Sequence, residues 1–298
     1  MLATNLLHER YAPEKYPPRV RDAATLLEMA RGENRQIPPL TADMEFQDLN
    51  HDDAYDVAAA GYGLRMHQGA VPVGRKIGFT NPNIWDEYSV HEPIWGYMFD
   101  TTVQTIDPGD VRVIDLSRLS HLQPRIEPEI VLGLIQPPSP EMDDDQLLSC
   151  VGWIAHGFEI VISIFPDWKF SVVDTIAASA LHGRLILGPK CSLEHERNTT
   201  SGRRKLLKQL ESFEIRLFRN GTLQDTGKGA NVLGGPIAAL RHLAKVLAGQ
   251  SRHPGLTAGE MISTGTLTGA PLIADGEQWH TELSGINLPG LHVRFKLQ

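Results

Sequence analysis

The feature that most restricts the fold of this chain is a nearly uninterrupted apolar run from Leu147 to Phe165. The run is about long enough to span a bilayer as a helix, but it carries His156 and Glu159 near its middle. An acidic side chain at the centre of a bilayer costs about 2.5–3.5 kcal/mol on insertion scales. We therefore expect a buried helix or strand with a functional carboxylate, rather than a membrane span.

The composition excludes several classes of protein. The chain has 298 residues, with 28 Lys and Arg against 36 Asp and Glu, and a net charge of −8. General nucleic-acid binders and anionic-membrane binders need a basic surface, so neither partner is expected. Only Cys150 and Cys191 are present, which excludes a disulfide framework and a Cys-rich zinc site. We expect a cytoplasmic protein, and no Walker loop, GxGxxG turn or G-x-S-x-G elbow is found.

Helical patterns come first along the chain. Apolar residues recur at helical spacing in residues 21–31 and again in 51–68, where Asn50 is a suitable N-cap. Strand-like segments follow from about residue 71. We expect residues 1–70 to form an N-terminal arm and helices that pack on a catalytic β-roll domain, residues 71–298.

The second part of the chain predicts many short strands and few helices. Asp174 can cap a short helix, residues 233–247 form a long one, and the polar stretch 194–208 is expected to be a flexible excursion. Asn220-Gly221 predicts a type I′ hairpin turn. The regular β-α alternation of a doubly wound sheet is missing, so an α+β protein with a mostly antiparallel sheet or roll is favoured. The expected strands are 71–79, 94–99, 111–114, 125–134, 184–188, 213–218, 261–267, 279–283 and 291–297, and residues 152–165 carry the apolar run.

Two glutamates stand two residues apart in the expected strand that begins at Arg125. Glu127 and Glu129 would point to the same face of this strand, ahead of a wholly apolar stretch. Two adjacent carboxylates in a semi-buried place repel each other unless one is protonated or a cation neutralises them. Oxygen ligands suit Mg²⁺ or Mn²⁺. The alternative is a solvated strand end with two surface glutamates.

Glu159 favours the metal site over that alternative. It is a lone charge in the apolar run, where it needs a partner. A third carboxylate that converges on the same cation satisfies this need, and so does a buried pair with Arg or Lys. We favour the cation.

Two further segments are candidates for binding and catalysis. Lys76 lies between Gly74 and Gly78 in an expected strand, where glycines allow a ligand to approach closely. An ammonium there can stabilise an oxyanion or transfer a proton. The passage from Thr264 to Gly269 offers hydroxyls and backbone N–H groups that can hold a carboxylate. A surface lysine and a plain turn are the alternatives.

Taken together, the motifs of this chain resemble the fumarylacetoacetate hydrolase superfamily, in its 2-keto-4-pentenoate hydratase and 4-oxalocrotonate decarboxylase branch. They occur in the family's order, and the resemblance covers nearly the whole chain from about Arg21. The matching motifs are GRKIGFT (74–80), EPIWG (92–96), EPEI (127–130), FEIV (158–161), DWK (167–169), DTIA (174–177), VLGGP (232–236) and TGTLT (264–268).

The resemblance implies a fold, a cofactor and a set of site residues. It implies a mixed β-sandwich roll with peripheral helices, a homo-oligomer, and a 2-oxo acid or its dienol that chelates Mg²⁺ or Mn²⁺. The implied residues are Glu127, Glu129 and Glu159 for the metal, Lys76, Glu92 and Lys169 for catalysis, and Leu233, Thr264, Gly265 and Thr266 for the substrate.

The chain departs from this branch at three positions. Ile94 stands where hydratases of the branch have an aspartate proposed to transfer a proton, and Ile162 and Ile164 replace an Asp and an Arg. Metal binding should survive these changes. The proton steps of water addition would then fall to Lys76, Glu92, Lys169 or a metal-bound water.

The implied activity is hydration of a 2-hydroxy-alka-2,4-dienoate to a 4-hydroxy-2-oxo acid. The metal would act as a Lewis acid that stabilises an enolate. Three alternatives stay open: a decarboxylase of a 2-oxo diacid, an acylpyruvate C–C hydrolase with His91 as its base, and a non-catalytic metal-binding partner of such an enzyme.

Overall fold

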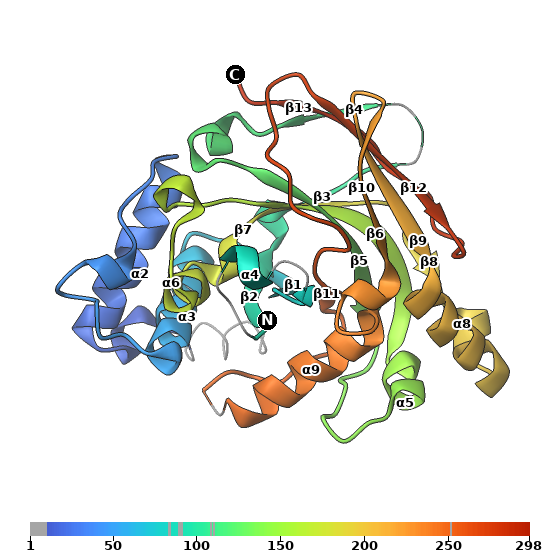
Figure 1. Ribbon diagram of the computed structural model, residues 1–298. Coiled ribbons are helices and arrows are strands. Elements are labelled where there is room, and N and C mark those ends of the chain that lie inside the picture. The colour runs from blue at the N-terminus through green and yellow to red at the C-terminus, as the bar shows by residue number, and fades with distance from the viewer. Residues whose placement is uncertain (1–10, 83–84, 89–91, 108, 110, 251) are drawn as a thin grey trace.

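Two β-sheets and the helices around them make up the structure, a computed structural model that describes residues 11–82, 85–88, 92–107, 109, 111–250 and 252–298. Most strand pairs are antiparallel, and the parallel ones are β1–β11, β3–β7 and β4–β13. The eight-stranded sheet runs β2 (Ile94–Phe99), β1 (Pro72–Gly78), β11 (Met261–Ser263), β5 (Arg125–Leu134), β6 (Val151–Val161), β7 (His182–Leu187) and β3 (Val103–Thr105), with β8 (Cys191–Ser192) beside β6. The five-stranded sheet runs β10 (Thr222–Lys228), β9 (Glu214–Arg219), β12 (Gln278–Ser284), β13 (His292–Lys296) and β4 (Arg112–Asp115). This is the expected α+β sandwich roll, shown in Figure 1.

An apolar core lies between the two sheets. Phe158 and Ile160 of β6 belong to it, so Glu159 between them points to the opposite face of the sheet. Ile126 of β5 belongs to it too, which directs its neighbour Glu127 to that same opposite face. The sheet therefore separates a dry core from a face that carries carboxylates. The core also contains Leu217, Trp279, Val293 and Phe295 of the smaller sheet.

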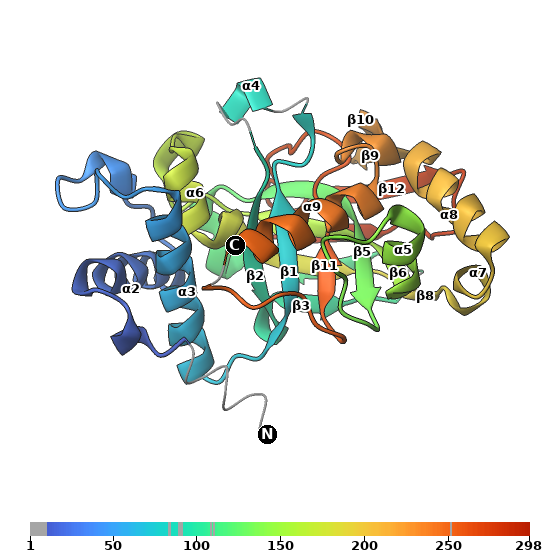
Figure 2. The same ribbon diagram turned by 90° about the horizontal axis from the view of Figure 1, so that it is seen from below.

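The helices cover the ends of the roll. In Figures 1 and 2, α2 (Pro18–Gly32) and α3 (His51–His67) lie at one end and α8 (Thr200–Ser212) at the other. Helix α2 packs on α3, which packs on α6 (Val172–Ala177). The remaining α-helices are α4 (Trp85–Tyr88), α5 (Asp144–Ser149), α7 (Glu194–Arg197) and α9 (Pro236–Gly249). Short 3₁₀ turns lie at Pro13–Lys15, Leu40–Ala42, Asp100–Thr102, Ser117–Leu122, Pro166–Trp168, Ser179–Leu181 and Gly229–Asn231.

Local sequence signals determine several of these elements. Asn50 caps α3 in a capping box with Asp53, as expected from its position. Asn220 and Gly221 have φ angles of 49° and 78°, which the tight β9–β10 turn requires. The helices α2 and α3 share one apolar core with strands β1 and β2. The division of the chain at residue 70 stays a prediction.

The apolar run from Leu147 forms the end of α5 and then strand β6. Among the residues that the structure describes, no helix has the length and apolarity to cross a membrane. The strand ends at Val161, before the apolar run itself ends.

Two expectations for local structure were wrong. The stretch 194–208 is not a flexible excursion, because α7 and the first part of α8 occupy it and α8 buries Leu206 and Leu210. These two leucines stand four residues apart, so they lie on the same face of the helix and pack together on the core. Asp174 is not the N-cap of α6 either: Ser171 is, and Asp174 at the third helical position completes its capping box.

Candidate metal centre

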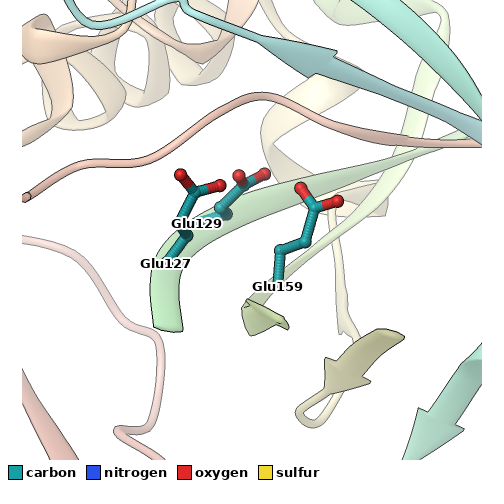
Figure 3. A group of neighbouring side chains, drawn as sticks. All are labelled: Glu127, Glu129 and Glu159. Atoms are coloured by element: carbon teal, nitrogen blue, oxygen red, sulfur yellow. The ribbon is translucent and has the colours of Figure 1, made fainter. Parts of the chain in front are cut away.

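Three carboxylates converge on one face of the larger sheet. Glu127 and Glu129 come from β5, and Glu159 comes from β6 directly across from Glu127. One carboxylate oxygen from each lies within 4.8 Å of the others. Figure 3 shows the three side chains pointing the same way from their strands. Glu129 and Glu159 are fully buried, and Glu127 is half-buried.

Glu129 is held by β11 and the loop that follows it. Its Oε2 atom accepts hydrogen bonds from the Ser263 hydroxyl at 2.5 Å and from the Gly265 backbone N–H at 2.9 Å. Gly265 has a φ of 100°, and a Cβ there would lie 1.8 Å from Thr80 Oγ1. Only glycine therefore lets this N–H approach the carboxylate.

Glu159 has a histidine and a lysine as its partners. Its Oε1 atom lies 2.8 Å from His182 Nδ1, and its Oε2 atom lies 3.3 Å from Lys76 Nζ. Lys76 also donates a hydrogen bond to the Ala180 carbonyl at 2.9 Å. His182 Nε2 in turn lies 2.9 Å from Thr102 Oγ1. The carboxylate is thus oriented from two sides.

The carboxylates and the lysine change one another's pKa. Burial raises the pKa of Glu127 to about 8, despite the attraction of Lys76, and the charge of Glu129 adds to the rise. Burial and the charge of Glu159 raise the pKa of Glu129 well above its usual value. Burial by itself would lower the pKa of Lys76, but the charges of Glu159, Glu127 and Glu129 outweigh it and raise that pKa. One ammonium therefore does not compensate three carboxylates.

The residues present fit a hard divalent cation. The Oε1 atom of Glu129 is buried and has no hydrogen-bond partner among the described residues. A buried carboxylate oxygen is costly to leave unpaired. Three carboxylates from neighbouring strands offer oxygen ligands alone, which suits Mg²⁺ or Mn²⁺ better than Zn²⁺.

A pocket opens beside these carboxylates. Lys76, Glu127, Gly265 and Thr266 contribute its polar lining. Its apolar wall consists of Phe79, Ile94, Val161, Trp168, Ala180 and Leu181. The pocket therefore offers polar groups to one part of a ligand and an apolar wall to the rest.

One wall of the pocket has an unusual backbone. Ser179, Ala180 and Leu181 have φ angles of 55°, 51° and 60°, in the left-handed region that residues other than glycine rarely adopt. Gly96 of β2 allows this segment to approach, since a Cβ there would lie 2.3 Å from the Ser179 carbonyl oxygen. The segment 179–181 is thus packed tightly against the sheet.

The structure brings together only some of the residues expected from the sequence. Glu92 is exposed and lies 3.3 Å from His51, and Lys169 is exposed while its neighbour Trp168 lines the pocket. The Thr264 hydroxyl donates a hydrogen bond to the Ile130 carbonyl. Leu233 has a φ of 57° and its N–H bonds the Thr80 carbonyl. None of these four lines the pocket, and His91 lies outside the described residues.

Sequence reasoning missed two partners of the carboxylates. Ser263 and His182 carry no local pattern that marks them, because each reaches its glutamate only through the pairing of strands. For Ser263, its place one residue before the expected binding passage was the available signal.

Comparisons with known proteins agree with this geometry. The fumarylacetoacetate (FAA) hydrolase C-terminal family model matches residues 87–291. The 2-keto-4-pentenoate hydratase of Paraburkholderia xenovorans is 32% identical over 91% of this chain and 93% of its own. The 2-hydroxyhexa-2,4-dienoate hydratase of Comamonas testosteroni is 30% identical over 85% of this chain and 89% of its own.

A solved structure shares the whole fold. The 4-oxalocrotonate decarboxylase from Pseudomonas putida G7, complexed with magnesium and adipate, superimposes with a TM-score of 0.80 and 26% identity over 93% of this chain and 97% of that one. Both the fold and the family match extend across the strands that carry the three glutamates. This chain therefore belongs to the fumarylacetoacetate hydrolase family.

Proposed function

We propose that this protein is a Mg²⁺-dependent lyase that hydrates a 2-hydroxy-alka-2,4-dienoate to a 4-hydroxy-2-oxo acid, with Mn²⁺ as a substitute metal. The observation that carries the proposal is the convergence of Glu127, Glu129 and Glu159 beside Lys76 at the polar part of a pocket. Hydratases that act on such dienoates are among the relatives, and the decarboxylase relative was solved with magnesium.

The roles of the residues follow from their contacts. Glu127, Glu129 and Glu159 would hold the ion, which supplies Lewis-acid stabilisation of an enolate when bound. Lys76 keeps its proton at Nζ because of the carboxylates around it, and it lines the pocket. It can therefore balance the charge of an enolate oxygen and return a proton to carbon. Gly265 and Thr266 line the same polar part.

The apolar wall indicates which acid fits. Among the described residues that line the pocket, Lys76 is the one cation, and it already contacts Glu159 and the Ala180 carbonyl. A second carboxylate at the far end of a substrate would lie against Ile94 and Leu181 and lose its hydration. We therefore favour a monoacid with an apolar tail.

Ile94 supports a second candidate, decarboxylation of a 2-oxo diacid. Its side chain is buried in the pocket wall and cannot transfer a proton. Loss of carbon dioxide needs the same enolate stabilisation but no activated water. The decarboxylase relatives have this activity in their names.

A direct assay separates these candidates. The purified protein with Mg²⁺ should remove the ultraviolet absorbance of 2-hydroxypenta-2,4-dienoate or its alkyl-substituted homologues and yield a 4-hydroxy-2-oxo acid by mass. Release of carbon dioxide from 4-oxalocrotonate, without turnover of the monoacids, would assign the decarboxylase instead. No turnover of either compound would reject both.

We also propose a homo-oligomer in the cytoplasm. The family resemblance supports the first point, and light scattering during gel filtration tests it. The second is supported by Cys150 and Cys191, which are both free, as is usual in a reducing compartment. Fractionation of the native host tests it.

A further inference from the structure

Arg31 reaches from the last turn of α2 to the wall of the pocket. Its Nη1 atom donates to the His182 carbonyl at 2.5 Å, and its Nη2 atom donates to the Ala178 carbonyl at 3.1 Å. These two carbonyls stand on either side of the three left-handed residues 179–181. One guanidinium thus holds both ends of the segment 178–182.

That segment supports the carboxylate site at two points. Its Ala180 carbonyl accepts the hydrogen bond from Lys76, and its His182 side chain holds Glu159. A left-handed residue other than glycine costs about 1–3 kcal/mol, so its surroundings must hold it in place. Two charge-assisted hydrogen bonds from Arg31 provide this restraint.

An ion pair between α2 and α3 lies next to Arg31. Glu28, one turn earlier in α2, makes a bidentate pair with Arg65 of α3, with N–O distances of 2.7 and 2.9 Å. Arg65 thus pairs with both oxygens of Glu28, while the guanidinium of Arg31 bonds the two backbone carbonyls. The pair also ties α2 to α3, so that Arg31 extends from a fixed support.

We propose that Arg31 is a positioning residue that fixes the segment 178–182, and through it Lys76 and Glu159, in the arrangement that binds the metal. Its effect on turnover rests on the proposed function, but its effects on metal binding and on local opening do not. Arg31 lies outside the matched family domain, residues 87–291, so the N-terminal helices would complete the site.

The test compares three variants: Arg31→Met, Arg31→Lys and the control Arg35→Met. Arg35 is exposed, lies four residues after Arg31 in the chain, and pairs with Glu33. Free Mn²⁺ is titrated by electron paramagnetic resonance, and hydrogen exchange by mass spectrometry follows peptides from residues 172–187 and from β12–β13.

We expect Arg31→Met to weaken Mn²⁺ binding about tenfold, at the low end for residues that orient metal ligands. In this variant, hydrogen exchange should be faster in residues 172–187 and unchanged in β12–β13. Arg31→Lys should recover part of the Mn²⁺ affinity. Arg35→Met should match the wild type.

Equal Mn²⁺ affinity and equal exchange in Arg31→Met and Arg35→Met would overturn the proposal. Faster exchange throughout the protein would do so too, because it indicates a general loss of stability. If Arg31→Met does not fold, Arg31→Gln replaces it under the same criteria. If the proposed function is wrong but this proposal is right, the wild type will show no turnover, while Arg31→Met will still bind Mn²⁺ more weakly than the wild type.

Discussion

Ile94 is the pocket residue that fits the proposed hydration least, because its side chain cannot transfer a proton. It is buried beside Gly78, in register with it across β1 and β2, and Lys76 Nζ lies in the same corner. An apolar side chain there excludes water from the position where a proton would be transferred.

We expect Ile94→Asp to raise the hydration rate about 10- to 100-fold, below or at the low end of what a positioned general acid or base contributes. Ile94→Asn has a similar shape but no acid, and should give no gain. Initial rates on a dienoate in Mg²⁺ measure both. Equal rates in the two variants would mean that a missing acid does not limit the reaction.

Residue-level predictions succeeded where strand geometry or burial constrained them. The same-face placement of Glu127 and Glu129 follows from the two-residue period of a strand, and the need of Glu159 for a partner follows from its apolar surroundings. The partners Ser263 and His182 depend on how distant strands pair, which no local pattern reports.

Among the elements, α8 differs most from expectation. Most residues of α8 are polar, but Leu206 and Leu210 are buried in the main core. The many Arg and Lys residues of the stretch 194–208 suggested a solvated excursion, although the spacing of Leu206 and Leu210 is that of a helix. Strand β5, whose second half is wholly apolar, was predicted with its correct bounds.

The stability of α8 gives a test of this packing. Leu210→Ala should lower the free energy of unfolding by about 2–5 kcal/mol, because it leaves a cavity in a closed core. Lys208→Ala, on the exposed side of the helix, should change it by less than about 0.5 kcal/mol. Urea denaturation measures both. A small effect for Leu210→Ala would indicate that α8 does not pack on the core.

On the scale of the whole molecule, the carboxylate site opposes folding when no metal is bound. The raised pKa values of Glu127, Glu129 and Glu159 mean that the folded state keeps protons that the unfolded state releases. The stability that these protons provide is therefore present below the ordinary glutamate pKa of 4.5 and is lost as pH rises through the raised pKa values, which for Glu127 is about 8.

Mg²⁺ should reverse this loss, since it binds the ionised carboxylates. We expect the rise in Tm on adding Mg²⁺, relative to EDTA, to grow between about pH 5 and about pH 8. Glu129→Gln should show a smaller rise at every pH. Differential scanning calorimetry gives the values, and a Mg²⁺ effect independent of pH would contradict the assignment of the site.

The overall architecture was predictable because several independent features of the sequence indicate the same fold. Many short strands without β-α alternation, and a set of ordered motifs, point to the same sandwich roll. How the N-terminal helices reach the site was not predictable, since the contacts of Arg31 join residues about half the chain apart.

We propose that Glu127, Glu129 and Glu159 together bind one divalent ion. Anomalous diffraction from a crystal soaked in Mn²⁺ tests it most directly, with Glu129→Gln as the variant and Glu282→Gln, an exposed residue of β12, as the control. We predict one strong peak within about 2.0–2.3 Å of an oxygen from each glutamate, lost in Glu129→Gln and kept in Glu282→Gln. A peak elsewhere, or none among the three carboxylates, would show that these glutamates do not form the metal site.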